Sequence, residues 1–191
     1  VSVTELIKPH RGKSWEVARP SRFARRITGN TPMKISGPAA GHSLLKTQMD
    51  STGMRVLGTL NNCAHGHTPW GTYLTCEENW NGYFGTKEAL LTQTPLEKRY
   101  GVTRTGFGYR WHEVNDRFDV RVNPNEPNRF GWVVEIDPYN PHSEPVKRTA
   151  LGRFKHEGAW VVVDDEDNVA VYMGDDERNE YIYKFVSALK F

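Results

Sequence analysis

The sequence predicts an all-β protein, and within that class several consecutive blades of a β-propeller. Short runs of β-branched and aromatic residues alternate with turn-forming residues along most of the chain. Three closely spaced runs near its end are typical of the antiparallel meander in a propeller blade. Two similar segments lie about two blade lengths apart, taking a blade as ~40–50 residues. The 191 residues are therefore expected to form one partial propeller domain with a loop and helix excursion at about 86–129.

Composition supports short strands and excludes two classes of partner. Aromatic residues make up 12% of the chain, and 17 glycines and 11 prolines favour turns over long helices. The net charge of +2 is spread among alternating acids and bases, so a nucleic-acid partner is not expected. No run approaches the ~18 apolar residues of a membrane span. Val1 falls inside a predicted strand, which indicates a piece of a longer protein without its own signal peptide.

The elements of the first half are predicted in order along the chain. Residues 1–19 form a hairpin in which HRGK joins the strands VSVTELI and SWEVA. Residues 20–57 are irregular. Strands follow at Met54–Leu60 and Gly71–Cys76, where apolar runs stand between turn formers, and the segment between them is expected to be a loop.

The excursion contains the predicted helices. Lys87–Leu91 is expected to form a helical turn, and Thr94–Tyr100 the main helix. In the latter, threonine stands at the cap, proline at the first position and glutamate three residues after the cap. Residues 102–129 are polar and form a long loop of the kind that often carries function. Strands resume at Gly131–Asp137.

The last third predicts one antiparallel sheet, with adjacent strands at Ala159–Val163, Val169–Met173 and Tyr181–Val186. Tight turns join them. The turn Asp164–Asn168 is rich in acids like a calcium loop, but it lacks the central glycine of such loops. A solvated turn is therefore expected there.

The stretch Leu60–Gly82 concentrates the reactive side chains. Cys63 precedes the strand Gly71–Cys76, and Glu77 and Glu78 close it. Strand ends and their loops are where sites are usually built. Cys63 stands in polar company and is expected to act as a ligand or nucleophile, whereas Cys76 is expected to pack in the core. A disulfide between the two thiols is the alternative.

An internal repeat links this stretch to a later one. GTLNNC and GRFKHE each place a metal-binding type of residue five positions after a glycine, and TYLTCEEN and VYMGDDER follow as strands ending in acids. The repeat aligns Glu77 with Asp176 and Glu78 with Glu177. Equivalent loops of propeller blades face one channel, although paired acids also fill ordinary exposed turns. The residues expected to meet there are Cys63, Glu77 or Glu78, Glu157, and Asp175 or Asp176.

Such a donor set suits a cluster of cations. Carboxylate and amide oxygens favour Ca²⁺, whereas a thiolate favours iron or zinc. Several cations in one pocket would attract an anionic substrate and polarise a phosphoryl oxygen.

Other motifs are weaker. The hydrolase serine elbow, the P-loop and the dinucleotide fingerprint are absent, and His112-Glu113 lacks the second histidine of a zinc protease helix. His65 and His67 either bind metal or orient their neighbours. Three basic side chains either hold phosphate or stay on the surface; they are Arg153, Lys155 and Arg178.

Five long motifs resemble the PhoX family of bacterial alkaline phosphatases. They are NNCAHGHTPWGTYLTCEENWNGYF, GRFKHEGA, VYMGDDERNEYIYKF, RITGNTPMKISGPAAGH and NEPNRFGWVVEIDP. The resemblance implies a six-bladed β-propeller that is exported by the twin-arginine route to the periplasm or the extracellular space. It also implies ferric and calcium ions joined by an oxo group, and hydrolysis of small phosphomonoesters. This chain would be roughly the first half of the catalytic unit, and a monomer is expected.

The resemblance also implies site residues. Cys63 would be an iron ligand, and the carboxylates of Glu78, Glu157 and Asp176 would complete the metal cluster in this part of the chain. Support of the ligands or contact with substrate would fall to Asn62, Glu77 and Arg178. No residue is assigned as a catalytic nucleophile or acid. The alternatives are a calcium-dependent propeller lactonase or phosphotriesterase, and a non-catalytic calcium-binding propeller module, neither of which gives Cys63 a role.

Overall fold

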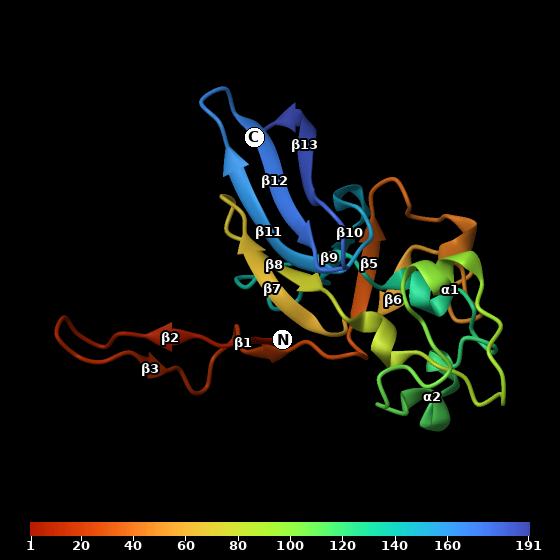
Figure 1. Ribbon diagram of the computed structural model, residues 1–191. Coiled ribbons are helices and arrows are strands. Elements are labelled where there is room, and N and C mark those ends of the chain that lie inside the picture. The colour runs from red at the N-terminus through yellow and green to blue at the C-terminus, as the bar shows by residue number, and fades with distance from the viewer.

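A computed structural model describes residues 1–191 and shows a mostly β protein built around one six-stranded sheet (Figure 1). The strand order of this sheet is β6-β5-β10-β9-β8-β7. Its strands are β5 (Pro32–Ser36), β6 (Arg55–Leu57), β7 (Asn62–His67), β8 (Tyr73–Glu77), β9 (Val133–Ile136) and β10 (Val146–Arg148). The all-β prediction is thus confirmed, whereas a closed propeller stays a prediction.

A second sheet is the predicted meander. It consists of β11 (His156–Val163), β12 (Asn168–Asp175) and β13 (Ile182–Lys190), paired antiparallel in that order. Each strand is longer than the sequence indicated. The sheet lies across β7 and β8, so that its first strand runs beside the edge of the central sheet (Figure 1).

The N-terminal residues form a projecting arm. Strands β2 (Leu6–Ile7) and β3 (Glu16–Val17) pair antiparallel and extend away from the body (Figure 1). The predicted hairpin is therefore confirmed, although its strands are short. The first strand, β1 (Ser2–Val3), pairs instead with β4 (Arg25–Arg26).

The helices are short, and none has the length or apolar character that a membrane span needs. The predicted capping box at the start of α1 (Pro95–Arg99) is confirmed: Glu97 N–H donates to Thr94 Oγ1 at 3.2 Å, and Thr94 N–H donates to Glu97 Oε2 at 2.7 Å. The prediction at Lys87–Leu91 is wrong, because that segment contains bends but no helix. Besides α1, the helices are α2 (Trp111–Val114) and the 3₁₀ helices η1 (Ser43–Leu45), η2 (Trp80–Tyr83), η3 (Asp116–Phe118), η4 (Glu126–Arg129) and η5 (Thr149–Leu151).

Three strands depart from the sequence predictions. β5 lies in the segment expected to be irregular, and it pairs parallel with β10, the one exception to antiparallel pairing among the named strands. β7 occupies the predicted loop before Gly71, because an edge strand with one exposed face needs no apolar run. β10 was missed because its buried central residue is Lys147.

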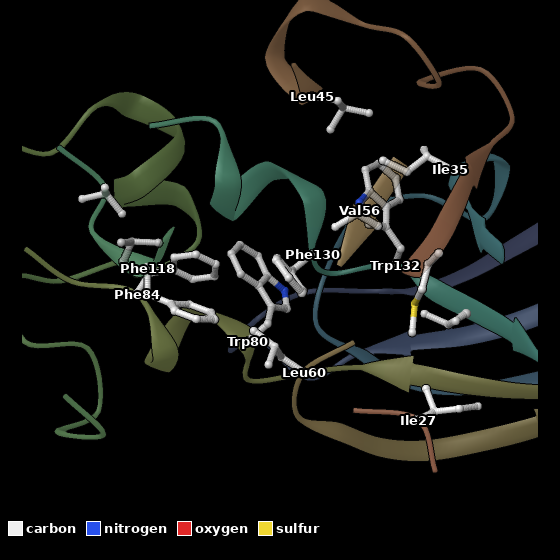
Figure 2. Packing of buried hydrophobic residues seen from close by; sticks show 14 of the residues in the cluster. Ile27, Ile35, Leu45, Val56, Leu60, Trp80, Phe84, Phe118, Phe130 and Trp132 are labelled. Carbon is white, nitrogen blue, oxygen red and sulfur yellow. The ribbon is translucent and has the colours of Figure 1, made fainter. Parts of the chain in front are cut away.

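Aromatic side chains fill the main core. Trp80, Phe84, Phe118 and Phe130 pack together where the excursion meets the central sheet (Figure 2). Neighbouring ring centroids among them lie 5.5 to 6.3 Å apart in tilted and edge arrangements, the range favoured by aromatic pairs. These contacts anchor the long excursion to the body.

A smaller core joins the two sheets. Its buried members come from both layers and include Leu74, Cys76 and Val133 of the central sheet and Val171 and Met173 of the meander. The sheets come closest at the crossing of β7 and β11. A Cβ atom added to Gly66 would lie 1.8 Å from the carbonyl oxygen of Ala159, so only glycine allows this approach. The name seam is used below for this crossing of β7 (Asn62–His67) and β11 (His156–Val163).

Candidate metal centre

Three potential metal ligands converge at one end of the seam. Cys63 lies near the start of β7, Glu78 directly follows β8, and Glu157 lies near the start of β11. One ligand atom of each lies within 4.8 Å of those of the other two, and Cys63 Sγ is 3.9 Å from Glu157 Oε1. The predicted convergence is confirmed. That these side chains bind metal stays a prediction.

Matching irregularities in two strands accompany this convergence. In β7 the pairing with β8 gains one residue between Asn62 and His65, and in β11 the pairing with β12 gains one between Glu157 and Trp160. A bulge bends its strand and redirects the side chains beside it. The two bulges stand next to Cys63 and Glu157, at equivalent places in two neighbouring hairpins.

Two asparagines that sequence reasoning did not single out fix Glu78. The backbone N–H of Glu78 donates to the carbonyl oxygen of Asn61 at 3.1 Å, and Asn79 Nδ2 donates to Glu78 Oε1 at 2.6 Å. Asn61 has φ of 47°, a left-handed conformation in which asparagine is enriched. The signal in the sequence was the asparagine beside each predicted ligand, in NNC and EEN.

Asp176 follows β12, and its carboxyl group lies beside that of Glu78. The alignment of the repeat is wrong by one residue, because Asn62 pairs with Glu77 and His156 pairs with Asp175, which makes Asp176, not Glu177, the equivalent of Glu78. Glu177 instead pairs with the ammonium group of Lys155. Asp176 keeps its place among the candidate ligands.

The ionised forms of these side chains repel one another. Desolvation and the negative charges of Glu157 and Glu78 raise the pKa of the Cys63 thiol. Desolvation and the neighbouring Asp176 and Glu157 carboxylates raise the pKa of Glu78. A cation among these groups would relieve the repulsion, and mixed sulfur and oxygen donors fit such an ion.

Glu77 points away from this cluster into the protein. Its carboxylate is fully buried and forms an ion pair with Lys147, with Oε1 2.8 Å from Nζ. The part of the prediction that gave Glu77 a contact with substrate is therefore wrong, because no side of the group is open. Alternate residues of β8 face opposite sides of the sheet, and Glu77 is the last of them.

The remaining predicted site residues occupy different settings. Asn62 is half-buried, and its Nδ2 donates to Thr59 Oγ1 at 2.6 Å. Arg178 is exposed two residues after Asp176, and its guanidinium forms no hydrogen bond or ion pair within the protein. That Asn62 supports the ligands or that Arg178 contacts substrate stays a prediction.

The two thiols are unpaired, so the disulfide alternative is not realised. Cys63 is exposed and Cys76 is fully buried. Burial raises the pKa of the Cys76 thiol to about 12. Cys76 is a core residue as predicted. His65 stacks on Tyr73 and His67 meets the edge of Trp160, and neither belongs to the converging ligand group.

Other predicted candidates have structural roles. Arg153 is stacked on Trp80 and Tyr100 and donates to backbone carbonyl oxygens, so it is not available to phosphate. Burial lowers the pKa of its guanidinium to about 10. The carboxylate of Asp164 accepts hydrogen bonds from Glu166 and Asn168 within its own turn, which confirms the solvated turn.

Comparison with known proteins identifies the family. The family model described as alkaline phosphatase PhoX matches residues 1–191. A solved structure described as Pseudomonas fluorescens PhoX in complex with vanadate, a transition state analogue, is 56% identical with a TM-score of 0.95. The match covers 100% of this chain and 32% of that chain, so this chain spans about a third of that protein's length, less than the expected half. No curated protein matches the chain. The chain belongs to the PhoX family of alkaline phosphatases.

Proposed function

We propose that this chain supplies part of the metal centre of a phosphatase that hydrolyses small phosphomonoesters. The observation that carries the proposal is the convergence of Cys63, Glu78 and Glu157 within 4.8 Å, from two sheets and three strand ends. Ligands brought together from distant parts of a chain are rarely explained by turn formation alone. Membership of the PhoX family and the vanadate named for its relative support phosphoryl chemistry.

The donor set supports iron together with calcium. Cys63 would hold a ferric ion, since a thiolate prefers the softer or more Lewis-acidic metal. Glu78, Glu157 and Asp176 would bind through oxygen and could be shared with calcium, which takes six to eight oxygen ligands. Bound cations of this kind polarise a phosphoryl oxygen and lower the pKa of a bound water.

The protein's own residues have separate tasks in this proposal. Asn79 donates to Glu78 and leaves its other carboxylate oxygen for a metal. Desolvation and the neighbouring Asp176 carboxyl raise the pKa of Glu78, and a bound cation would favour the ionised form of this ligand. The free guanidinium of Arg178 is suited to bidentate contact with phosphate.

We further propose the propeller architecture. β7 and β11 are each the edge strand of their sheet, and they cross at the seam as first strands of neighbouring blades would. Both would face a central channel that holds the metals. A monomeric protein in the periplasm or the extracellular space accords with the family resemblance.

Metal content and turnover of two variants of the full-length protein test the function. Glu157→Gln removes a ligand charge, and we expect it to lose iron and to lower phosphomonoester turnover by ~100-fold or more. Glu166→Gln alters an exposed carboxylate in the turn of the same hairpin and should leave both unchanged.

Full metal and full turnover in Glu157→Gln would contradict the proposal. Calcium without iron, together with lactonase or phosphotriesterase activity, would support the calcium-dependent enzyme in its place. Calcium without any turnover would support a non-catalytic module.

A further inference from the structure

The buried carboxylate of Glu77 joins β8 to three other segments of the chain, one of which leads to Cys63. Oε1 accepts hydrogen bonds from the backbone N–H of Leu60 at 3.3 Å and from Lys147 Nζ at 2.8 Å. Oε2 accepts from the N–H groups of Gly131 and Trp132 at 3.0 and 3.1 Å. All four donors are satisfied by a single side chain.

These contacts lie directly behind the ligands. Leu60 stands three residues before Cys63, and Glu77 immediately precedes Glu78. The segment from Leu60 to Asn61 lies outside any strand, and the bulge between Asn62 and His65 interrupts the pairing just beyond it. The hydrogen bond from Leu60 to Glu77 therefore holds the segment just before Cys63 against the end of β8, where regular strand pairing is missing.

Lys147 holds this carboxylate in place. Its Nζ also donates to the carbonyl oxygen of Arg129 at 2.8 Å and lies 4.0 Å from the centre of the Phe130 ring. Neither Lys147 nor Glu77 has exposed surface. The desolvation of two charges cancels much of their attraction, so a buried ion pair is weak evidence for a role in stability. What such a pair does supply is a fixed geometry.

We propose that Glu77, with Lys147 as its counter-ion, is a positioning residue that sets the separation of Cys63 and Glu78. The inference rests on the proposed function, because it assumes that these two side chains share a metal. Glu77 acts through the backbone on both sides of the site: through Leu60 toward Cys63, and through its own peptide bond toward Glu78.

Shortening the side chain tests this role in the full-length protein as isolated. Glu77→Asp keeps the charge but withdraws the carboxylate by one methylene, so that it no longer reaches Leu60 and Trp132 together. We expect the chelator concentration that removes half the iron to fall at least tenfold, at a temperature where circular dichroism shows the variant folded. Glu135→Asp makes the same change in the adjacent strand β9, away from the ligands, and should leave iron retention unchanged.

The double variant Glu77→Gln/Lys147→Met covers a failure of Glu77→Asp to fold. It removes both buried charges while keeping similar volumes. Three backbone donors remain, and glutamine cannot accept from them on both sides as the carboxylate does, because half of its head group is itself a donor. Iron retention should again fall at least tenfold. Retention within twofold of wild type in either folded variant would overturn the positioning role. Wild-type protein without iron and without turnover would instead overturn the proposed function.

Discussion

At the scale of single residues, the two cysteines show how surroundings decide the role of one chemical group. Cys63 is exposed beside two carboxylates, whereas Cys76 is enclosed by apolar side chains between the sheets. Their sequence contexts already indicated this division, since Cys63 follows two asparagines and Cys76 ends an apolar run. The same residue type therefore gives two separable predictions.

Cys63→Ser in the full-length protein is expected to lose iron and phosphatase activity together. A hydroxyl gives up its proton far less readily than a thiol, so the serine is a poor ligand. Calcium content should fall less, since its ligands would be carboxylates. Metal analysis beside turnover measures both effects.

Cys76→Ser is the matched control for that substitution. It places a hydroxyl in the buried contact between the sheets and should lower the free energy of unfolding by about 1–3 kcal/mol. Activity per folded molecule should be retained. Full iron and full activity in Cys63→Ser would remove its ligand role and favour a centre that holds calcium alone.

The acid stability of the protein should depend in part on Glu135. Burial by itself would raise the pKa of this carboxyl, but hydrogen bonds from Thr72 and Trp70 and the ion pair with Arg148 outweigh it and lower the pKa. The folded pKa of Glu135 thus lies below its ordinary value. The resulting stabilisation is present above that value and is lost as the pH falls through the folded pKa.

Glu135→Gln should therefore lower the free energy of unfolding by about 1–2 kcal/mol at pH 7 and by less at pH 3. Urea unfolding at the two pH values measures the difference. A loss that is equal at both would show that the charge of Glu135 contributes nothing.

Sequence reasoning reached the candidate ligands at this scale but not the residues that support them. Cys63, Glu78 and Glu157 stand at strand ends, which a sequence pattern reveals. The sequence could not tell which of the adjacent acids Glu77 and Glu78 faces inward. That depends on Lys147, which lies 70 residues away from Glu77 and has no apolar signal of its own.

At the scale of elements, the seam between β7 and β11 is what assembles the site. The sequence predicted the meander and the capped helix well, because apolar alternation and capping are local signals. It missed β5 and β10, which pair with each other across more than 100 residues, and β7, which pairs with the neighbouring β8 but lacks an apolar run. β7 in particular is polar along its exposed face and shows no strand period in its apolar residues.

Gly66→Ala should separate the two sheets at the seam. The added methyl group would meet the Ala159 carbonyl oxygen, and backbone cannot move aside as a flexible side chain can. We expect a loss of about 2–4 kcal/mol in the free energy of unfolding and a fall in metal content. Differential calorimetry and metal analysis of the full-length variant measure these.

Gly174→Ala is the control for that substitution. Gly174 also lies in a strand, β12 of the meander, but a Cβ atom there would make only an ordinary contact of 3.5 Å with the Glu157 carbonyl oxygen. It should cost far less stability and keep its metal. Equal behaviour of the two alanine variants would mean that close approach at the seam is not required.

At the scale of the whole molecule, apolar surface gathers at two extremities. The arm exposes Leu6, Ile7, Trp15 and Val17, and β13 exposes an apolar row along a free sheet edge. A long apolar edge strand is a ready template for pairing with another strand. Such surface is consistent with a chain that spans about a third of its solved relative.

The 191-residue chain expressed by itself is therefore expected to self-associate through β13. Val186→Lys, on this edge strand, should shift the chain toward the monomer. Val162→Lys makes the same change at an exposed position of β11, an edge strand that packs against β7 and β8, and should have a smaller effect. Sedimentation at several protein concentrations measures the association, and a wild-type chain that stays monomeric would contradict it.

The distance along the chain between Cys63 and Glu157 also bears on how the protein folds. The two ligands are 94 residues apart, so they meet only after a loop of that length has closed. Contacts between residues so far apart in sequence form late in folding, because closing the loop between them costs entropy before the contact contributes any stabilisation. Formation of the β7–β8 hairpin brings Cys63 and Glu78 together early in folding, whereas Glu157 joins them only when the meander packs against this hairpin. A metal ion could thus not serve as the nucleus of folding. It would instead stabilise the seam after both hairpins have formed, and its removal would slow the last step of folding more than the first.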